Sequence, residues 1–374
     1  MLKNAYIIGL TGNIASGKSV IRRLLENSGA LGIDADLLAQ RTYLKGAPAF
    51  QAILDAFGEH LLDPFGEINR KALAQIVFSD REKLMHLEAI VHPLVQRSLD
   101  FLIQESQTRL IVIEAIKLFE IGFDRLCQSV WVSEADNNIR LQRLVNQRGM
   151  LREYAEMRLS SQPPQEEKLQ KADVIIQTEG SFTQTWQQVR NALKSAGLND
   201  FDPSECCPLE NGIIARPLRF NKASTAAKFL EQENLNTTTV EDIMQILGQR
   251  SLFSIWKTDK LLGLISWQIS NFTAVVESFV RKNMCITRET SQTVLYIMQS
   301  LAERHLTEVL FVLPGAGLTI NATALDYQLI QYKKLENPIS RSILNRYNSD
   351  SKAIFMKTLN TNGLILKSME TKTL

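Results

Sequence analysis

The segment Gly12–Ser19 constrains the fold of this 374-residue chain more than any other feature. It has the pattern G-x-x-x-x-G-K-S and follows a short apolar run at residues 6–10. Gly12 and Gly17 allow backbone angles that other residues resist, so the N–H groups of such a loop can point inward around a phosphate. A helix predicted over Ser19–Glu26 adds the positive end of its dipole. The pattern therefore predicts a phosphate-binding loop, or P-loop, between a strand and a helix.

The residue types of the loop suggest its contacts. The predicted nucleotide-binding residues are Gly12, Asn13, Ile14, Ala15, Ser16, Gly17, Lys18 and Ser19. We expect Lys18 to reach the β- and γ-phosphates of a nucleotide and the Ser19 hydroxyl to bind Mg²⁺. The alternative is a glycine-rich turn with an incidental lysine. Because glycine is scarce, with 18 in the chain, and because the flanking elements fit, we favour the P-loop.

Apolar strands alternate with helices through the first half of the chain. Strands are predicted at 6–10, 110–113, 130–132 and 174–176, with long amphipathic stretches between them. Fully apolar strands are typical of a parallel sheet that is covered by helices on both faces. Residues 35–107 hold no strong strand, which predicts a helical insertion between early strands. The expected fold class is α/β.

Residues 196–211 hold two prolines, several acids and little periodicity, which is typical of a linker. We predict a first domain at 1–196, a linker at 197–211 and a second domain at 212–374. In the second domain, strands at 252–258, 261–268 and 274–280, a helix at 288–304 and a strand at 309–313 indicate an α+β layout. A long loop within one domain is the alternative, but each part is long enough for its own core.

Composition excludes several classes of protein. Lys plus Arg is 42 and Asp plus Glu is 40, a net charge of +2 that gives no overall attraction to nucleic acid. The four cysteines form no C-x-x-C pair, and reduced thiols are the simplest interpretation. No apolar run approaches the roughly 18 residues that would span a bilayer. We expect a cytoplasmic protein with no nucleic-acid and no membrane partner.

Two aspartates in Ile33-Asp34-Ala35-Asp36 follow a short strand that is predicted to start near Ala30. A carboxylate at the carboxyl end of such a strand faces the crevice where the γ-phosphate lies. It could orient an acceptor hydroxyl, accept its proton or act through Mg²⁺. Alternatively, either aspartate caps the following helix. We predict a catalytic role for Asp34 and a capping role for Asp36.

The P-loop alone does not distinguish kinases from other nucleotide-binding proteins. The chain has no N-K-x-D motif, which argues against a GTPase. The segment Leu110–Glu114 is similar to a strand that ends in a Walker-B acid, so a motor ATPase stays open. A regulatory protein that uses ATP as a switch is a third possibility. We favour a kinase, because the helical insertion falls where an acceptor site would lie.

The order of short motifs along the chain resembles dephospho-CoA kinase, a relative of the nucleotide monophosphate kinases. After the P-loop and the two aspartates, the matching pieces are Gly46–Ala49, Phe57-Gly58, Asp63–Gly66, Asn69–Leu73, Phe78, His92-Pro93-Leu94, Leu118-Phe119-Glu120, Arg140, Arg143 and Arg148. The resemblance covers residues from about 5 to 196. Apart from the P-loop each piece is short, and it is their order that is specific.

This resemblance implies a reaction, in which ATP with Mg²⁺ phosphorylates the 3′-hydroxyl of dephospho-CoA to give coenzyme A and ADP. Asp34 matches the family's acceptor-activating aspartate, and Lys18 and Arg140 complete the predicted catalytic set. Arg143 lies three residues after Arg140, on the same helix face, and is predicted to contact the nucleotide as a lid closes. His92 is predicted to border the acceptor site. The alternatives are a solvated face for the arginines and a structural His-Pro pair.

The chain departs from the family's pattern at a few positions. Val20 stands where the family usually has Thr, and Ile116-Lys117 stands where it has Pro-Leu. Metal binding by Ser19 should survive the first change. We include Lys117 among the substrate-binding residues, because its ammonium could add a phosphate contact. An acceptor other than dephospho-CoA, similar to a nucleotide, is the alternative within the kinase class.

The second domain, over residues 213–358, resembles a GNAT-type N-acetyltransferase. That fold normally binds acetyl-CoA at a glycine-rich turn before its helix, whereas the corresponding turn at 281–288 has no glycine. Arg281, Lys282 and Arg288 could still attract phosphates, although an ordinary basic turn is the alternative. The resemblance implies either an acetyl-CoA or CoA binding module or a catalytically inactive interaction domain. We favour a GNAT-like α+β fold with lost or altered chemistry.

Overall fold

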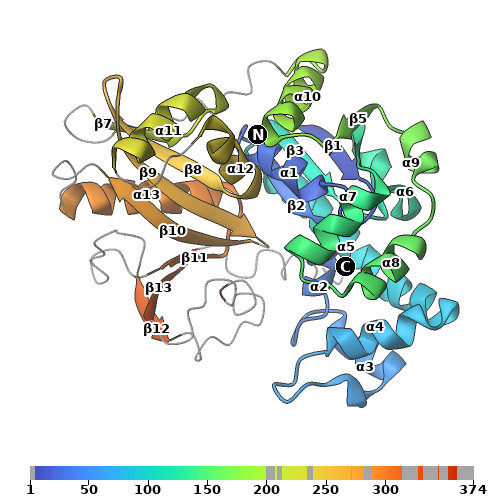
Figure 1. Ribbon diagram of the computed structural model, residues 1–374. Helices are drawn as coiled ribbons and strands as arrows, with labels where there is room; N and C mark the ends of the chain where they lie inside the picture. Colours follow the sequence, from blue (N-terminus) through green and yellow to red (C-terminus); the bar gives the residue numbers. More distant parts are fainter. Residues whose placement is uncertain are drawn as a thin grey trace.

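The computed structural model describes residues 5–198, 207–208, 213–233, 239–270, 272–281, 288–313, 327–331, 344 and 353–359. These residues form two β-sheets that lie side by side, each with its own helices (Figure 1). The strands of the first sheet all come from the first half of the chain, and those of the second sheet from the second half. The domain boundaries at 196 and 212 stay predictions.

The first sheet is parallel, with the strand order β2-β3-β1-β4-β5. Its strands are β1 (Tyr6–Thr11), β2 (Leu31–Asp34), β3 (Leu110–Glu114), β4 (Ser129–Glu134) and β5 (Val174–Gln177). The central strand β1 pairs with β3 on one side and with β4 on the other. The predicted parallel sheet is confirmed, and each predicted strand is present with ends that differ by one or two residues.

Helices cover both faces of this sheet because its strands are apolar on both faces. Ile8 and Leu10 of β1 pack against α1 (Lys18–Glu26) and α10 (Phe182–Ser195). The intervening Ile7 packs on the opposite face, with the core that includes α2 (Ala35–Arg41) and α5 (Arg81–Glu105). Between β3 and α10 the chain also forms α6 (Leu118–Ile121), α7 (Asn137–Gln142), α8 (Arg152–Ser160) and α9 (Glu166–Gln170), with a π-helical turn at Arg143–Gln147 after α7.

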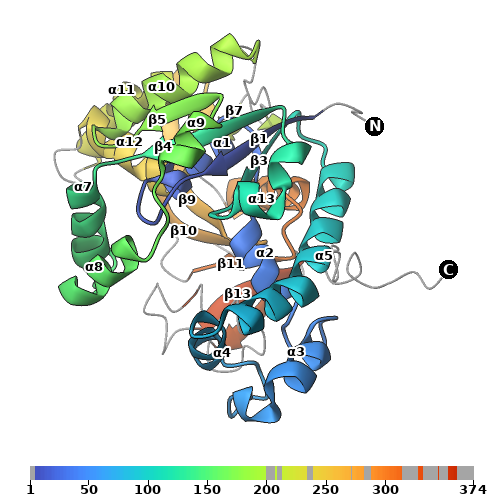
Figure 2. The same ribbon diagram turned by 90° about the vertical axis from the view of Figure 1, so that its right-hand side faces the viewer.

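The predicted helical insertion is confirmed. It consists of α2 (Ala35–Arg41), α3 (Phe50–Phe57), α4 (Arg70–Phe78) and the long α5 (Arg81–Glu105). Figure 2 shows α3 and α4 at one end of the molecule, away from the sheet. Between β2 and β3 the chain makes no strand, only an isolated bridge between Leu62 and Ile68.

The second sheet is mixed, with the order β12-β13-β11-β10-β9-β8-β7-β6. Its strands are β6 (Cys207–Pro208), β7 (Ile213–Pro217), β8 (Ser251–Lys257), β9 (Lys260–Ser270), β10 (Thr273–Arg281), β11 (Val309–Val312), β12 (Gln328–Gln331) and β13 (Ala353–Thr358). The predicted meander β8-β9-β10 is antiparallel, and α13 (Arg288–Arg304) crosses over to β11, which is parallel to β10. The predicted α+β layout is confirmed. The short β6, which lies inside the predicted linker, has too few residues to show a periodic signal.

Helices also cover both faces of the second sheet. Phe253 and Ile255 of β8 pack into the same core as α13. Leu252 and Trp256 point the other way, toward α11 (Ala223–Gln232) and α12 (Val240–Gln249). Within the parts of the chain that the structure describes, no helix is long and apolar enough to cross a membrane.

The two halves contact each other along α1, α10 and α12. Asn27, at the end of α1, donates hydrogen bonds to the carbonyl oxygens of Leu247 and Arg250 at 2.6 and 3.2 Å. The rings of Trp186 on α10 and Phe220 stack with their centroids 3.8 Å apart. The helix that follows the P-loop is therefore packed directly against the second domain.

Candidate active site

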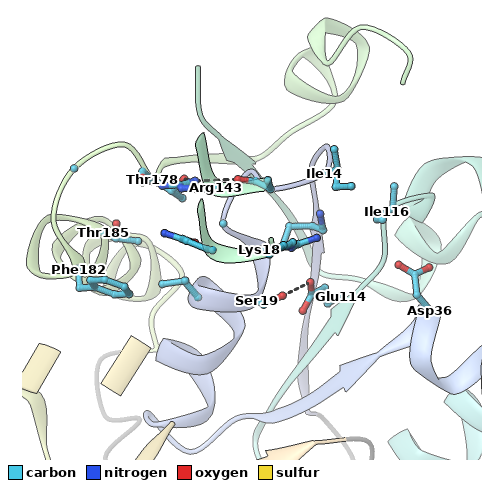
Figure 3. A pocket seen from close by; sticks show the side chains of 16 residues that line it. Ile14, Lys18, Ser19, Asp36, Glu114, Ile116, Arg143, Thr178, Phe182 and Thr185 are labelled. Atoms are coloured by element: carbon cyan, nitrogen blue, oxygen red, sulfur yellow. Dashed lines mark hydrogen bonds between the residues drawn. The ribbon is translucent and has the colours of Figure 1, made fainter. Parts of the chain in front are cut away.

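The predicted site residues of the first domain gather at the carboxyl edge of the parallel sheet. The P-loop joins β1 to α1, while Asp34 ends β2 and Glu114 ends β3. Thr178 directly follows β5. A pocket of about 390 Å³ opens at this edge, and its wall includes Lys18, Ser19, Asp36, Glu114 and Arg143 (Figure 3). This edge is where ligands bind in parallel α/β sheets.

Both glycines of the P-loop occupy positions that a side chain would not tolerate. Gly12 has φ 142° and Gly17 has φ 94°. A Cβ on Gly12 would lie 2.5 Å from the Ser133 hydroxyl oxygen, and a Cβ on Gly17 would lie 2.8 Å from Thr178 Oγ1. No side chain caps the first turn of α1, so its amide groups can receive an anion. The loop geometry therefore has the form that the sequence predicted.

Lys18 lies inside the loop that it terminates. Its ammonium donates to the carbonyl oxygens of Gly12 and Asn13, at 2.9 and 3.1 Å, and the residue is 7% exposed. Burial lowers the pKa of Lys18 to about 8, although the nearby carboxylates of Glu114 and Asp36 act in the opposite direction. An anion among the loop amides would oppose this effect of burial and favour the charged ammonium.

Ser19 is hydrogen-bonded to Glu114. In the sequence, Glu114 was noted only because a motor ATPase has a similar Walker-B acid. The Ser19 hydroxyl donates to Glu114 Oε1 at 3.0 Å, as the dashed line in Figure 3 shows. Arg22 Nε donates to the other oxygen, Glu114 Oε2, at 2.6 Å, and Arg22 Nη1 donates to Glu26 Oε1 at 2.6 Å. The strand-end acid therefore orients the predicted metal ligand and is itself held by a buried arginine.

The two aspartates after β2 have different environments. Asp34 is the N-cap of α2 and accepts a hydrogen bond from the Leu37 amide at 2.9 Å. The prediction that Asp36 is the cap is therefore wrong, because β2 ends at Asp34 and the helix begins one residue later. Asp36 instead lines the pocket, where its charge interacts with Lys18. Burial, together with the charge of Glu114, raises the pKa of Asp34 to about 6, and burial raises that of Asp36.

The predicted arginines contact the loop from outside. Arg140 Nε donates to the Ile14 carbonyl oxygen at 2.9 Å, and Arg143 Nη1 donates to that of Ala15 at 3.0 Å. Arg140 is 6% exposed, whereas Arg143 also lines the pocket. Arg148, which follows the π-helical turn, lines the pocket as well.

Two glutamines that sequence reasoning missed also bind the P-loop. Gln165 Oε1 accepts from the Asn13 amide at 2.9 Å, and Gln162 Oε1 accepts from the Ile14 amide at 2.8 Å. Gln162 Oε1 accepts from Arg140 as well, at 3.1 Å. Neither glutamine has a local pattern that could have revealed this role, since both lie about 150 residues from the loop in sequence.

His92 and Lys117 lie near each other, outside the pocket lining. Lys117 Nζ is 2.7 Å from Glu88 Oε1, and both Glu88 and Lys117 interact electrostatically with His92. Burial lowers the pKa of His92. The charge of Lys117 also reaches Asp36, which connects this group to the pocket. Lys117 therefore lies on the Asp36 side of the site, and His92 interacts with Lys117.

Sequence comparisons agree with this geometry. The family model for dephospho-CoA kinase matches residues 6–184. A dephospho-CoA kinase from Carboxydothermus hydrogenoformans is 40% identical over 191 residues, which cover 50% of this chain and 93% of the relative. This chain belongs to the dephospho-CoA kinase family. The match includes the P-loop, both aspartates and the arginine-bearing segment, and confirms the resemblance seen in the sequence.

Two solved structures are each similar to part of this chain. The TT1252 protein from Thermus thermophilus is 32% identical and covers 52% of this chain and 98% of its own, with a TM-score of 0.48. The ribosomal-protein-S5-alanine acetyltransferase from Vibrio fischeri is 12% identical and covers 41% of this chain and 97% of its own, with a TM-score of 0.30.

The donor atoms of the kinase pocket fit Mg²⁺. The Ser19 hydroxyl and the carboxylates of Glu114 and Asp36 are hard oxygen donors in the lining of this pocket. Among the described residues, no group of three or more His, Cys, Asp or Glu side chains could hold a metal by itself. Mg²⁺ suits such a site, because it usually keeps several waters and takes its other ligands from substrate phosphates.

Proposed function

We propose that this member of the dephospho-CoA kinase family transfers the γ-phosphoryl group of ATP to the 3′-hydroxyl of dephospho-CoA, giving coenzyme A and ADP. The observation that carries the proposal is the arrangement of one pocket. The uncapped start of α1 and Lys18 offer positive charge at its centre, and Asp36 offers a carboxylate to one side (Figure 3). This pairing suits a polyphosphate donor next to a hydroxyl acceptor.

The loop and the arginines hold the donor in this proposal. The amides of the first turn of α1 and the Lys18 ammonium bind the β- and γ-phosphates. Arg143 and Arg148 line the same pocket and oppose the charge that develops on the phosphates. Arg140, predicted from the sequence as catalytic, fits a positioning role better, because its guanidinium contacts the loop backbone.

The acceptor is activated by a carboxylate in this proposal. The 3′-oxygen attacks the γ-phosphorus, the bond to the β,γ-bridging oxygen breaks, and the hydroxyl proton passes to an aspartate. Asp36 suits this role better than Asp34, since Asp36 lines the pocket while the Asp34 carboxylate caps α2. A catalytic role for Asp34 remains the sequence-based alternative.

Mg²⁺ would be held by Ser19, with the carboxylate of Glu114 beside it. When bound, the ion supplies positive charge that neutralises the phosphate oxygens. His92 and Lys117 would border dephospho-CoA, with the Lys117 ammonium available to its phosphates. The electrostatic interaction of Lys117 with Asp36 supports this assignment, and His92 interacts in turn with Lys117.

A coupled assay of ADP release by the full chain tests this function. With ATP and Mg²⁺, ADP should form only when dephospho-CoA is added, and Lys18→Met should abolish its formation. A protein that uses ATP as a switch would release ADP at the same slow rate with or without the acceptor. That result, or no release at all, would contradict the kinase proposal.

For the second domain we propose the binding of acetyl-CoA or CoA. Most of the turn that would hold the pyrophosphate, residues 282–287, lies outside the described residues. The topology of a meander, a crossover helix and a parallel strand supports a GNAT-like fold. Titration of acetyl-CoA into the full chain, with the kinase pocket saturated by ATP, would test binding at this second site.

A further inference from the structure

One wall of the kinase pocket is the first turn of α10, and this turn is bonded to the second domain. Phe182 and Thr185 of α10 line the pocket. Figure 3 shows them on one side of Lys18, with Asp36 on the other side. If the acceptor lies at Asp36, the base and ribose of ATP extend toward Phe182. The wall that they meet is thus one of the parts of the kinase domain that the second domain contacts.

A carboxylate from α12 completes the hydrogen bonding of this turn. Ser181 caps α10, and its capping box with Gln184 satisfies two of the free amides at the helix start. The amide of Phe182 donates instead to Glu241 Oε1 at 2.8 Å. The hydroxyl of Thr183 donates to Glu241 Oε2 at 2.5 Å. Both oxygens of Glu241 therefore hold the start of α10, where the helix dipole also favours a negative charge.

The ring of Phe182 packs against α12 at Gly248. Gly248 lies within α12, where glycine costs about 1 kcal/mol relative to alanine. A Cβ at this position would lie 2.2 Å from Phe182 Cδ1 and 2.4 Å from Cε1. Phe182 also packs against the apolar core of the second domain. The same side chain therefore belongs to the nucleotide pocket and to the interface between the domains.

We infer that the second domain forms a structural part of the ATP site, in which Glu241 and Gly248 position Phe182 and the first turn of α10 against the nucleotide. This inference rests on the proposed function, because it takes ATP as the occupant of the pocket. Glu241 is a positioning residue: it contacts the wall and not the substrate. The extra domain thus contributes to nucleotide affinity whether or not it has chemistry of its own.

The test is the separate effect of Glu241→Ala on each substrate of the full chain. We expect the KM for ATP to rise about tenfold, in the range of a lost charge-assisted hydrogen bond. The kcat and the KM for dephospho-CoA should change by less than about twofold, because Lys18 and Asp36 are untouched. Glu241→Gln, which keeps one acceptor oxygen for the Phe182 amide, should restore part of the ATP affinity.

Asp242→Ala is the matched control. Asp242 lies next to Glu241 in the first turn of α12 and closes the capping box with Thr239, but it is exposed and bonds within its own helix. Its loss weakens the start of α12 without removing a contact to α10. An unchanged KM for ATP in Glu241→Ala, or an equal rise in Asp242→Ala, would overturn the inference.

Gly248→Ala is a second variant that tests the inference, and its result does not depend on whether Glu241→Ala folds. Alanine favours the helix, so α12 should persist, while the new methyl group displaces Phe182. We expect the same rise in the KM for ATP, and a wild-type value would overturn the inference. Direct titration of ATP without acceptor separates the two proposals. If the wild-type chain binds ATP but does not phosphorylate dephospho-CoA, the proposed function fails, while weaker ATP binding by both variants still supports the inference.

Discussion

The hydroxyl of Ser19 donates a hydrogen bond to the carboxylate of Glu114, with 3.0 Å between Oγ and Oε1. This bond joins the end of the P-loop to the end of β3, the neighbour of the loop's own strand. The second oxygen of Glu114 is held by Arg22, which also pairs with Glu26. The orientation of the predicted metal ligand therefore depends on a buried charge network below the pocket.

Replacing Glu114 by Gln tests this network. Arg22 keeps Glu26 as a partner, so the free energy of unfolding should fall by no more than about 1.5–3 kcal/mol, the range for a lost hydrogen bond to a charged group. We also expect kcat to fall at least about tenfold, since Ser19 loses its charged acceptor. Denaturant unfolding and steady-state kinetics measure the two effects. Glu105→Gln, at the exposed end of α5, is the control. If both variants have the same free energy of unfolding and the same kcat, the charge network is not needed for stability or activity.

The pair Asp36→Asn and Asp34→Asn separates the two acidic candidates. If Asp36 accepts the acceptor's proton, its replacement should lower kcat by about 10²–10⁴. Asn is as good a helix cap as Asp, so Asp34→Asn should keep α2 and lose much less activity. Steady-state kinetics with both substrates decides between them. The reverse ranking would restore Asp34 to the role that the sequence suggested.

Asp34→Asn should also change the pH dependence of stability. The folded-state pKa of Asp34 is about 6, above the unfolded value of about 3.9, so the native state holds this proton more tightly. The stability that this proton provides is present below pH 4 and is lost as the pH rises through 6. Asn cannot ionise, so the variant's Tm relative to wild type should rise between pH 4 and pH 7. A constant difference in Tm across this window would contradict the shifted pKa.

Lys117→Met tests the acceptor side of the site. The Lys117 ammonium is about half exposed and 2.7 Å from Glu88, so its contribution to acceptor binding should be modest. We expect the KM for dephospho-CoA to rise about two- to fivefold, with no change in the KM for ATP. Lys83→Met serves as the control, because it removes an exposed lysine from α5 in the helical insertion. An unchanged KM for dephospho-CoA would remove Lys117 from the substrate-binding set.

The sequence was most informative where the signal is local. The P-loop, the five parallel strands and the meander each have a short pattern of apolar residues and glycine, and all are present in the structure. The capping of α2 by Asp34 and the place of Asp36 in the pocket had no local signal, because they depend on whether α2 begins at residue 35 or two residues later. A shift of that size also decides which carboxylate faces the pocket.

Contacts between segments that are distant in the sequence could not be predicted from it. Gln162 and Gln165 reach the P-loop from the segment before α9, and Glu241 reaches α10 from the second domain. Each is an ordinary polar residue on the surface of its own element, and only the packing of the elements makes it a partner. The sequence could therefore assign a reaction to the first half but no structural role to the second half.

The most direct measurement follows the γ-phosphoryl group itself. The full chain is incubated with Mg²⁺, dephospho-CoA and ATP that carries an isotopic label in its γ-phosphate, and the products are separated by mass. The label should appear in coenzyme A as a phosphate that a 3′-nucleotidase removes, and Asp36→Asn should suppress its transfer. Label found only in free phosphate, or in no product at all, would contradict phosphoryl transfer to dephospho-CoA at this pocket.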